Sequence, residues 1–353
     1  SGAAADHAED LLFMAIDNFL QGSGPKPNTV CFSNCASARA HATATKDFSI
    51  RCEKLWHCLS NLYVQSDFDV DFRPDLRLGN IVIAAYARDR RRPTAVDEAT
   101  AFLGKMQLYA APDIISYNTI LDALAKRGIS DKAREIVRSL ESSASLQPDI
   151  VSYNCLLTAL AKDEGVLAEE VEDELERMKI LGEKNPSVKP DRVSFTIAID
   201  AWSRSSDPLR VKKAKELVNF MLKHFTDDQR LRPDIIVFTT LIKLCATATD
   251  SEGLKREALD VALGAMHVID SSKYGSANDI AFSTMVRAVK TLCFNDTLRR
   301  ELLMSIFQKC VASGNVSKRV FHAVQPYGVS SDDLKPGWSR NVPKPHRPFW
   351  NNT

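Results

Sequence analysis

Residues 115–128 read ISYNTILDALAKRG, and residues 148–162 read PDIVSYNCLLTALAK. In both stretches a Tyr-Asn pair begins a series of apolar residues with the spacing i, i+3, i+4 and i+7. This spacing is typical of one face of an α-helix. The first series is Tyr117, Ile120, Leu121 and Leu124, and the second is Tyr153, Leu156, Leu157 and Leu160. The two stretches therefore predict two copies of the same helix.

Pro-Asp pairs extend this repeat along the chain. The pairs are Pro74-Asp75, Pro112-Asp113, Pro148-Asp149, Pro190-Asp191 and Pro233-Asp234, and their Asp residues are separated by 38, 36, 42 and 43 positions. Where the pattern is clear, a second apolar series follows the first, as in Ala133, Ile136, Val137 and Leu140. Each repeat is therefore predicted to be a helical hairpin. Because a single hairpin cannot bury both of its apolar faces, we expect the hairpins to stack into an all-α solenoid.

The same pattern defines the expected organisation of the whole chain of 353 residues. Seven hairpins are predicted in residues 27–315. Residues 1–26 are expected to hold one helix near Glu9 to Leu20, as the second half of a truncated repeat, followed by a linker. Residues 316–353 are expected to form a C-terminal cap and a tail too rich in Pro for a helix. The acidic opening SGAAADHAED does not resemble a targeting peptide, so we expect the native start to be missing.

The two quoted stretches resemble the pentatricopeptide-repeat family, whose repeats have the pattern Val-x-Tyr-Asn-x-Leu-Ile and end in Pro-Asp. The resemblance implies a right-handed superhelix of P-type-like repeats. Several repeats here are longer than the family norm, so we expect insertions between helices or between hairpins. Tetratricopeptide repeats are an alternative of the same architecture, but their Trp, Gly-Tyr and Ala signature is missing from this chain.

The resemblance also implies recognition of single-stranded RNA at one base per repeat. The base is read by the fifth residue of the first helix and by the last residue of the repeat. Carried over to this sequence, the pairs are Ser33 with Asp75, Asn80 with Asp113, Asn118 with Asp149, Asn154 with Asp191, Thr196 with Asp234, Thr239 with Asn278, and Ser283 with Asn315. Apolar residues that would sandwich the bases are Val30, Ile115, Val151, Val193, Ile236 and Ile280, and Arg77 departs from this type.

The chemistry of these pairs gives an approximate target. In the family a fifth-position Asn goes with pyrimidines, and Ser or Thr goes with purines. At the last position Asp only accepts hydrogen bonds and suits the ring N–H of uracil or guanine, whereas Asn can donate to the unprotonated ring nitrogen of adenine or cytosine. The pairs spell approximately GUUUGAA. For any single pair a structural role is also open, because Asp after Pro is a common helix N-cap.

The charge balance keeps a second class of function open. The chain has 46 Lys and Arg against 45 Asp and Glu, a net charge of +1, so RNA binding has to use a local basic surface. The alternative is a protein-interaction scaffold in an organellar ribonucleoprotein or ribosome-associated assembly. A less favoured alternative is an RNA-processing enzyme whose catalytic domain lies outside this chain. By resemblance we expect a mitochondrial or chloroplast role in RNA stability, processing, editing or translation.

The sequence suggests no catalytic site, cofactor, metal site, small-molecule substrate or membrane span. Cys35, Cys52, Cys245 and Cys310 fall in the apolar series and resemble small core residues, and unpaired buried thiols favour a reducing compartment. A zinc site at Cys31, Cys35, Cys52, His57 and Cys58 lacks a recognisable ligand spacing. The acidic residues from Glu169 to Glu176 alternate with Val171 and Leu175, which favours a solvated helix face over a nuclease site. Arg88, Arg90, Arg91 and Arg92 could neutralise phosphates.

Overall fold

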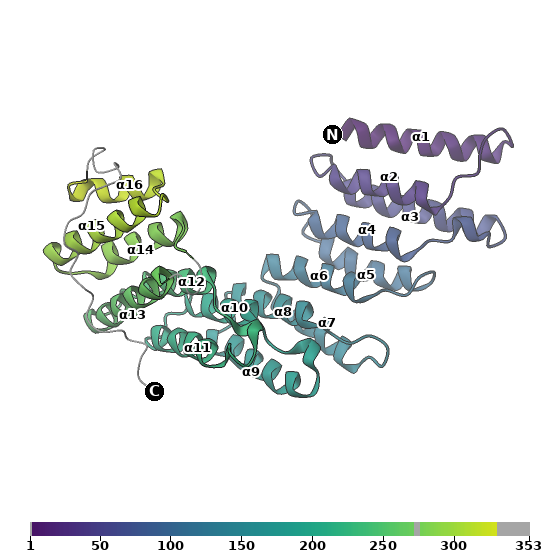
Figure 1. The fold of residues 1–353 in the computed structure, drawn as a ribbon. Coiled ribbons are helices and arrows are strands. Elements are labelled where there is room, and N and C mark those ends of the chain that lie inside the picture. Colours follow the sequence, from purple (N-terminus) through teal and green to yellow (C-terminus); the bar gives the residue numbers. More distant parts are fainter. Residues whose placement is uncertain (1, 272–275, 330–353) are drawn as a thin grey trace. The chain divides into compact units, whose positions relative to one another are not determined.

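The structure, a computed structural model, describes residues 2–271 and 276–329. Throughout these residues the regular elements are helices, and no strand occurs among them (Figure 1). The α-helices are α1 (Gly2–Leu20), α2 (Thr29–His41), α3 (Phe48–Gln65), α4 (Leu76–Arg88), α5 (Ala95–Gln107), α6 (Ile114–Arg127), α7 (Ser130–Ser142), α8 (Ile150–Lys162), α9 (Ala168–Lys184), α10 (Arg192–Trp202), α11 (Arg210–His224), α12 (Ile235–Cys245), α13 (Glu252–Asp270), α14 (Asp279–Leu292), α15 (Asp296–Ala312) and α16 (Lys318–Val324). The predicted all-α class is confirmed.

Helices α2 to α15 fall where the repeat predicts seven hairpins. The even-numbered helices from α2 to α14 are the first helices of these hairpins, and the odd-numbered helices are the second. The chain divides into two compact units, Ser1–Asp163 and Glu164–Thr353. In the first compact unit α2, α4, α6 and α8 pack side by side in that order, and in the second α10, α12, α14 and α16 do the same. This is the stacking of a solenoid.

Pro-Asp recurs because Asp begins each first helix. The side chains of Asp75, Asp113, Asp149, Asp191 and Asp234 all accept hydrogen bonds from backbone N–H groups in the first turn of the helix that follows. Such N-caps satisfy donors that have no partner within the helix. Asn278 caps α14 in the same way, without a preceding Pro.

The longer repeats contain short 3-10 helices, as expected for insertions. These are η1 (Val70–Phe72), η2 (Pro186–Val188) and η3 (Gln229–Leu231), and one residue separates each from the Pro-Asp pair that follows. Each buries one apolar residue, namely Phe72, Val188 and Leu231. The insertions therefore add to the core and leave the start of the next first helix unchanged.

The apolar series form the core between the helices. At the fourth position of the first helix Phe32, Tyr153, Phe195, Phe238 and Phe282 are almost fully buried. In α4 this position is Gly79, where an added Cβ would lie only 2.6 Å from the Met106 sulfur. Met106 thus fills the space that an aromatic ring occupies in the other hairpins, which explains why this repeat matches the sequence pattern less well.

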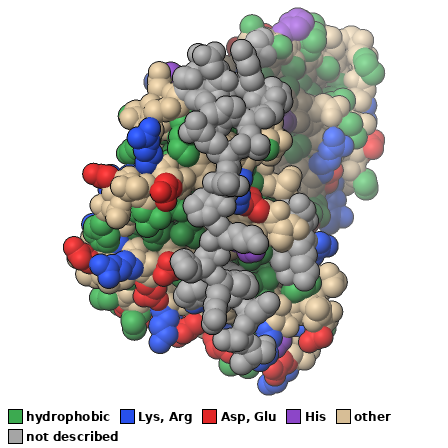
Figure 2. All heavy atoms as spheres, turned by 60° about the vertical axis from the view of Figure 1, so that its left-hand side comes forward, with side chains coloured by type: hydrophobic (Ala, Val, Ile, Leu, Met, Phe, Trp, Pro, Cys, Tyr) green, Lys and Arg blue, Asp and Glu red, His purple; other side chains and the backbone are tan. Residues whose placement is uncertain are grey.

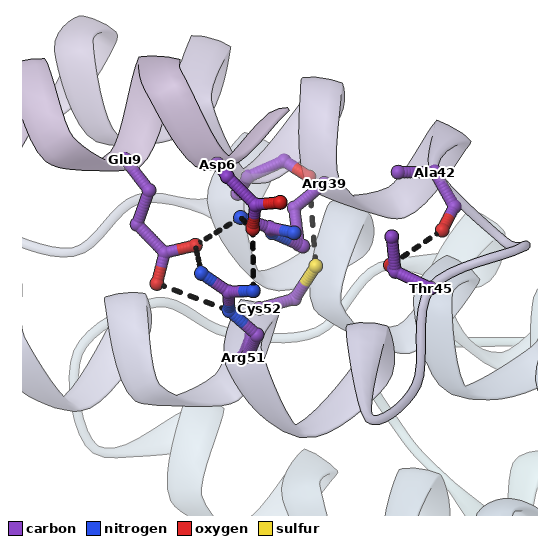
Figure 3. A network of polar contacts seen from close by, with 8 residues as sticks. Asp6, Glu9, Arg39, Ala42, Thr45, Arg51 and Cys52 are labelled. Atoms are coloured by element: carbon purple, nitrogen blue, oxygen red, sulfur yellow. Dashed lines mark hydrogen bonds and ion pairs between the residues drawn. The ribbon is translucent and has the colours of Figure 1, made fainter. Parts of the chain in front are cut away.

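The first helix of the chain is held by buried charges. Arg39 of α2 is fully buried, and its Nη2 lies 2.8 Å from Asp6 Oδ1 and 2.5 Å from Glu9 Oε2 of α1. Arg51 of α3 pairs with the same two carboxylates (Figure 3). A buried charge is tolerated only when it is paired in this way. Helix α1 starts at Gly2, so it is longer than the predicted helix near Glu9 to Leu20.

At the other end, α16 and the 3-10 helix η4 (Gln325–Tyr327) pack against α14 and α15 as a cap. The predicted Pro-rich tail from residue 330 onward lies outside the described residues. Within those residues, none of the helices has the length and apolar character needed to cross a membrane.

Candidate nucleic-acid interface

The Asp at the end of a repeat caps the helix that follows, and its carboxylate can also accept a hydrogen bond from a ligand. Asp113 Oδ1 accepts from Ser116 N at 2.9 Å, and Asp149 Oδ1 accepts from Ser152 N at 2.9 Å. The alternative interpretation of these residues as N-caps is therefore correct as structure. It uses only one carboxylate oxygen, however, because both contacts are made by Oδ1. Asp113 and Asp149 are half-buried residues, and the second oxygen of each carboxylate can accept from a ligand.

The structure brings two of the predicted pairs into direct contact. Asn80 Nδ2 lies 3.3 Å from Asp113 Oδ1, and Asn118 Nδ2 lies 3.1 Å from Asp149 Oδ1. The members of each pair belong to neighbouring hairpins and are 33 and 31 residues apart in sequence. Each pair is half-buried and places an amide beside a carboxylate. An amide N–H and a carboxylate oxygen together complement a base edge that carries a carbonyl and a ring N–H.

Partial burial acts to raise the pKa of Asp113. Hydrogen bonds from the Ser116 backbone N–H, from its hydroxyl and from Asn80 outweigh this effect, and the pKa is lowered from its ordinary value. Asp113 is therefore an ionised group that only accepts hydrogen bonds at neutral pH.

The hydroxyl residues at the fifth position are arranged differently. Thr196 Oγ1 donates to the carbonyl of Arg192 at 2.7 Å, and Ser283 Oγ donates to that of Ile280 at 3.0 Å. Their hydroxyl hydrogens are thus used within their own helices, and an oxygen lone pair remains for a ligand. Thr239 is also half-buried. Asn154 belongs to the first compact unit and Asp191 to the second, so this pair is described only by its separate members.

The first predicted pair, Ser33 with Asp75, does not offer both side chains to a base, because Ser33 is buried. Ser33 is only 1% exposed, and its hydroxyl oxygen has no hydrogen-bond partner within the described residues. Asp75, its predicted partner, is half-buried and caps α4. In this hairpin the fifth side chain does not reach the surface, so the identity of the first base has no support from the geometry.

The last predicted pair, Ser283 with Asn315, differs from the others in its local structure. Helix α16 is capped by Ser317, whose Oγ accepts from Val320 N at 3.4 Å. The predicted residue Asn315 therefore lies two positions before the cap, whereas the Asp residues of the earlier repeats are themselves caps. Both amide hydrogens of Asn315 are already used, because Nδ2 donates to the carbonyls of Ala277 and Ser313. Residues 313–317, between α15 and α16, contain no Pro, so the sequence pattern does not mark the start of α16.

The residues predicted to sandwich bases form a consistent set of exposed apolar side chains. Each occupies the second position of a first helix, and all are between 48% and 60% exposed: Val30, Ile115, Val151, Val193, Ile236 and Ile280. Arg77 of α4 is exposed at the same position. An apolar residue repeated at an exposed position on successive helices is available to stack on flat ligands.

A set of basic residues lies on the same helix face, and of these the sequence pointed only to Arg88. Eleven residues after the second position stand Arg88, Lys126, Lys162 and Arg204, all exposed. Eleven residues are about three helical turns, so these cations lie on the face that carries the apolar residue. The spacing itself was a readable signal. In α2, α12 and α14 the equivalent residues are His41, Thr247 and Thr291.

Acidic residues moderate this positive charge. Lys126 pairs with Asp122, and Arg204 Nη2 lies 2.7 Å from Asp200 Oδ2. Lys243 Nζ lies 2.7 Å from the other oxygen of Asp200. Burial acts to raise the pKa of Asp200, but Lys243 and Arg204 outweigh it and the pKa is lowered. On the face shown in Figure 2, basic and acidic side chains are intermixed over the described surface.

The acidic residues of α9 and the buried cysteines have structural roles. Glu172 on α9 accepts from Trp202 Nε1 at 3.1 Å, and Glu174 pairs with Arg177 at 2.8 Å, as expected for a helix surface. Burial raises the pKa of the Cys52 thiol to about 12, so it remains a protonated core residue. Among the described residues no three His, Cys, Asp or Glu side chains are grouped to hold a metal ion.

Comparisons with known proteins agree with this architecture. A sequence model of the PPR repeat family matches residues 112–162. No curated protein matches the chain in sequence. The crystal structure of the pentatricopeptide repeat protein PPR10 from maize is similar with a TM-score of 0.51 and 18% identity, covering 93% of this chain and 43% of the maize chain. PPR10 in complex with an 18-nt psaJ RNA element gives a TM-score of 0.41 at 15% identity, covering 89% of this chain and 43% of that chain.

This chain therefore spans less than half the length of the maize protein, and at 18% identity the likeness shows the fold alone. The family match covers the stretch where the Tyr-Asn and Pro-Asp patterns are clearest. The hairpins on either side repeat the same cap, buried fourth residue and exposed second residue with few exceptions. Residues 112–162 are thus similar to the PPR repeat family, and the all-helical fold of the chain is similar to that of a pentatricopeptide repeat protein.

Proposed function

We propose that this protein binds single-stranded RNA sequence-specifically through its first helices, at one base per repeat. The contacts between Asn80 and Asp113 and between Asn118 and Asp149 carry the proposal. In both, an amide and a carboxylate from successive hairpins meet beside an exposed apolar residue, Ile115 or Val151. PPR10, whose fold is similar to that of this chain, has been crystallised with an RNA element, which supports the proposal.

In this proposal each pair reads a Watson–Crick edge. The Asp carboxylate accepts the ring N–H of uracil, and the Asn amide donates to a uracil carbonyl. The exposed apolar residues pack against the flat faces of the bases, which is favourable for any base and holds the edge in position. The basic residues at or just beyond the ends of the first helices bind the phosphates. Affinity then comes from stacking and charge, and specificity comes from the pairs.

The proposed target is GUUUGAA, with the clearest geometric support at the second and third bases. By family resemblance we propose a role in mitochondrial or chloroplast RNA metabolism, in which the chain itself performs no catalysis. The rival proposal is a protein-interaction scaffold, and the intermixed charge of Figure 2 is the observation that favours it.

Binding to labelled GUUUGAA, measured by fluorescence anisotropy against GCCCGAA and GAAAGAA, separates the two. We expect GUUUGAA to bind most tightly. We also expect its affinity to fall between about 50 and 200 mM salt because phosphate contacts release counterions. Equal affinity for the three RNAs, with little dependence on salt, would favour the scaffold.

A further inference from the structure

A buried serine lies between the two members of each supported pair. Ser116 is the third residue of α6 and has no exposed surface. Its Oγ lies 2.6 Å from Asn80 Oδ1 and 2.9 Å from Asp113 Oδ1, and it accepts from Asp113 N at 3.2 Å. A hydroxyl has one hydrogen, and the shorter contact directs it to Asn80.

The next hairpin repeats this arrangement. Ser152, the third residue of α8, is also fully buried. Its Oγ lies 2.6 Å from Asn118 Oδ1 and 3.1 Å from Asp149 Oδ1, and it accepts from Asp149 N at 3.2 Å. The same network therefore recurs in two successive hairpins, which share the residues Pro-Asp-Ile-x-Ser-Tyr-Asn.

The serine occurs where the preceding hairpin has Asn at its fifth position. Asn80 is followed by Ser116, Asn118 by Ser152, and Asn154 by Ser194. Where the fifth residue is Ser33, Thr196 or Thr239, the third residue of the next first helix is instead apolar, namely Leu78, Val237 or Ala281. An N-cap alone does not require this correlation, because Asp75 caps α4 with Leu78 at the third position.

We propose that Ser116 and Ser152 are positioning residues for base recognition, which fix the amide orientation of the Asn in the preceding hairpin. The serine hydroxyl holds the amide oxygen, and the carboxylate holds one amide N–H. A rotation of the amide by half a turn would place its NH2 group against the serine and its carbonyl against a carboxylate, which is unfavourable. The second amide N–H is therefore presented as a donor for the ligand.

This inference rests on the proposed function and deepens it. Uracil has a carbonyl where cytosine has an amino group, so a fixed amide donor distinguishes the two pyrimidines. Without the serine only the carboxylate orients the amide, so the rotated form, which presents its oxygen and suits cytosine, becomes more populated. The serine therefore contributes to the choice of uracil without touching the base.

The test compares Ser116→Ala and Ser152→Ala with the wild-type protein on GUUUGAA, GCUUGAA and GUCUGAA. Ser116→Ala should reduce the preference for uracil over cytosine at the second base by about fivefold and leave the third base unaffected. Ser152→Ala should do the same at the third base and leave the second unaffected. Because the two networks are alike, either variant tests the inference if the other fails to fold.

The matched control is Ser130→Ala. Ser130 is also buried, and its hydroxyl donates to Asp163 Oδ2 at 2.6 Å, but it begins a second helix. It should lower thermal stability without changing base preference. If the wild-type protein prefers uracil at both bases and the two variants keep that preference, or lose it at both bases together, the serines are merely structural. If the wild-type protein itself shows no preference, the proposed function fails and this inference with it.

Discussion

At the level of single residues, the Asp149 carboxylate caps a helix with one oxygen and can bind a ligand with the other. Asp149 Oδ1 accepts from Ser152 N and from Asn118 Nδ2, which fixes the start of α8 and joins neighbouring hairpins. The other oxygen is left for a ligand. The side chain that begins the helix is thus held rigidly enough to recognise a base, because its position is determined by the backbone that it caps.

Asn can also cap a helix, so a substitution at this position can change recognition without removing the cap. Asp149→Asn should shift preference at the third base from uracil toward cytosine, because the amide donates to an unprotonated ring nitrogen. Asn278→Asp should shift the sixth base from adenine toward guanine for the converse reason. Competitive binding should show changes on the order of 1–3 kcal/mol at those bases alone. If neither variant alters base preference, RNA reading by these pairs is wrong.

At the scale of the element, each first helix has one face that meets its neighbours and one that is exposed. The exposed face of α6 carries Ile115 in its first turn and Lys126 in its last. The second helices of the hairpins from α3 to α13 do not carry this combination of an exposed apolar residue in the first turn and a basic residue in the last. Their surface charges, such as those of α9, pair with one another along the helix.

Lys126→Ala should weaken RNA binding by a similar factor for all sequences and should reduce its salt dependence, because one phosphate contact is lost. Lys132 is a close control. Both lysine side chains are about half exposed, at 53% and 51%, and both pair with a surface Asp, but Lys132 lies on the second helix α7. Lys132→Ala should therefore leave the salt slope unchanged. Equal effects of the two variants would contradict the assignment of the first-helix face.

The contact of α1 with α2 and α3 depends on one buried cation. Arg39→Ala would leave Glu9, which is 8% exposed, without its closest partner. Removing one member of a buried ion pair costs about 3–5 kcal/mol. Arg51 shares the same carboxylates but is 33% exposed, so Arg51→Ala should cost less. Urea unfolding and hydrogen exchange of α1 would measure the loss of stability in each variant. An equal loss in Arg39→Ala and Arg51→Ala would contradict the importance of burial at Arg39.

At the scale of the whole molecule, charges of both signs are nearly equal in number and many are paired. The net charge of +1 gives no general attraction for RNA. Any attraction has to come from the local sets of basic residues on the first helices. The same pairing makes the stability of the fold depend on ionised carboxylates.

Acidification should reveal this dependence. The pKa values of Asp113 and Asp200 are lowered in the folded protein from an ordinary value of 3.8. A lowered folded-state pKa means that the stabilisation is present above the unfolded value and is lost as the pH falls through the folded value. The urea midpoint should therefore change little from pH 7 to 5 and fall below about pH 4. The double variant Asp113→Asn, Asp200→Asn should show a shallower fall. A decline centred near pH 6 would instead implicate histidines.

The helices, their caps and their order follow from the amino-acid sequence, because these depend on local spacing and on residues a few positions apart. The predicted stacking followed since hairpins with two apolar faces have few other ways to bury them. By family resemblance the sequence also indicated the second-position residues that would sandwich bases, and these residues are exposed in the structure. The sequence did not predict that Met106 of α5 packs against Gly79 of α4. This contact depends on how the two helices pack, which local spacing does not show.

Only the tertiary structure decided which predicted pairs meet and which do not. Asn80 reaches Asp113 because successive first helices pack side by side, whereas Ser33 is buried and the cap of α16 is Ser317. Exposure at the fifth position depends on how neighbouring helices pack, and no Pro marks the start of α16 in the sequence. The sequence did not indicate the role of the bridging serines, because Ser116 contacts Asn80, which lies 36 positions earlier in the chain.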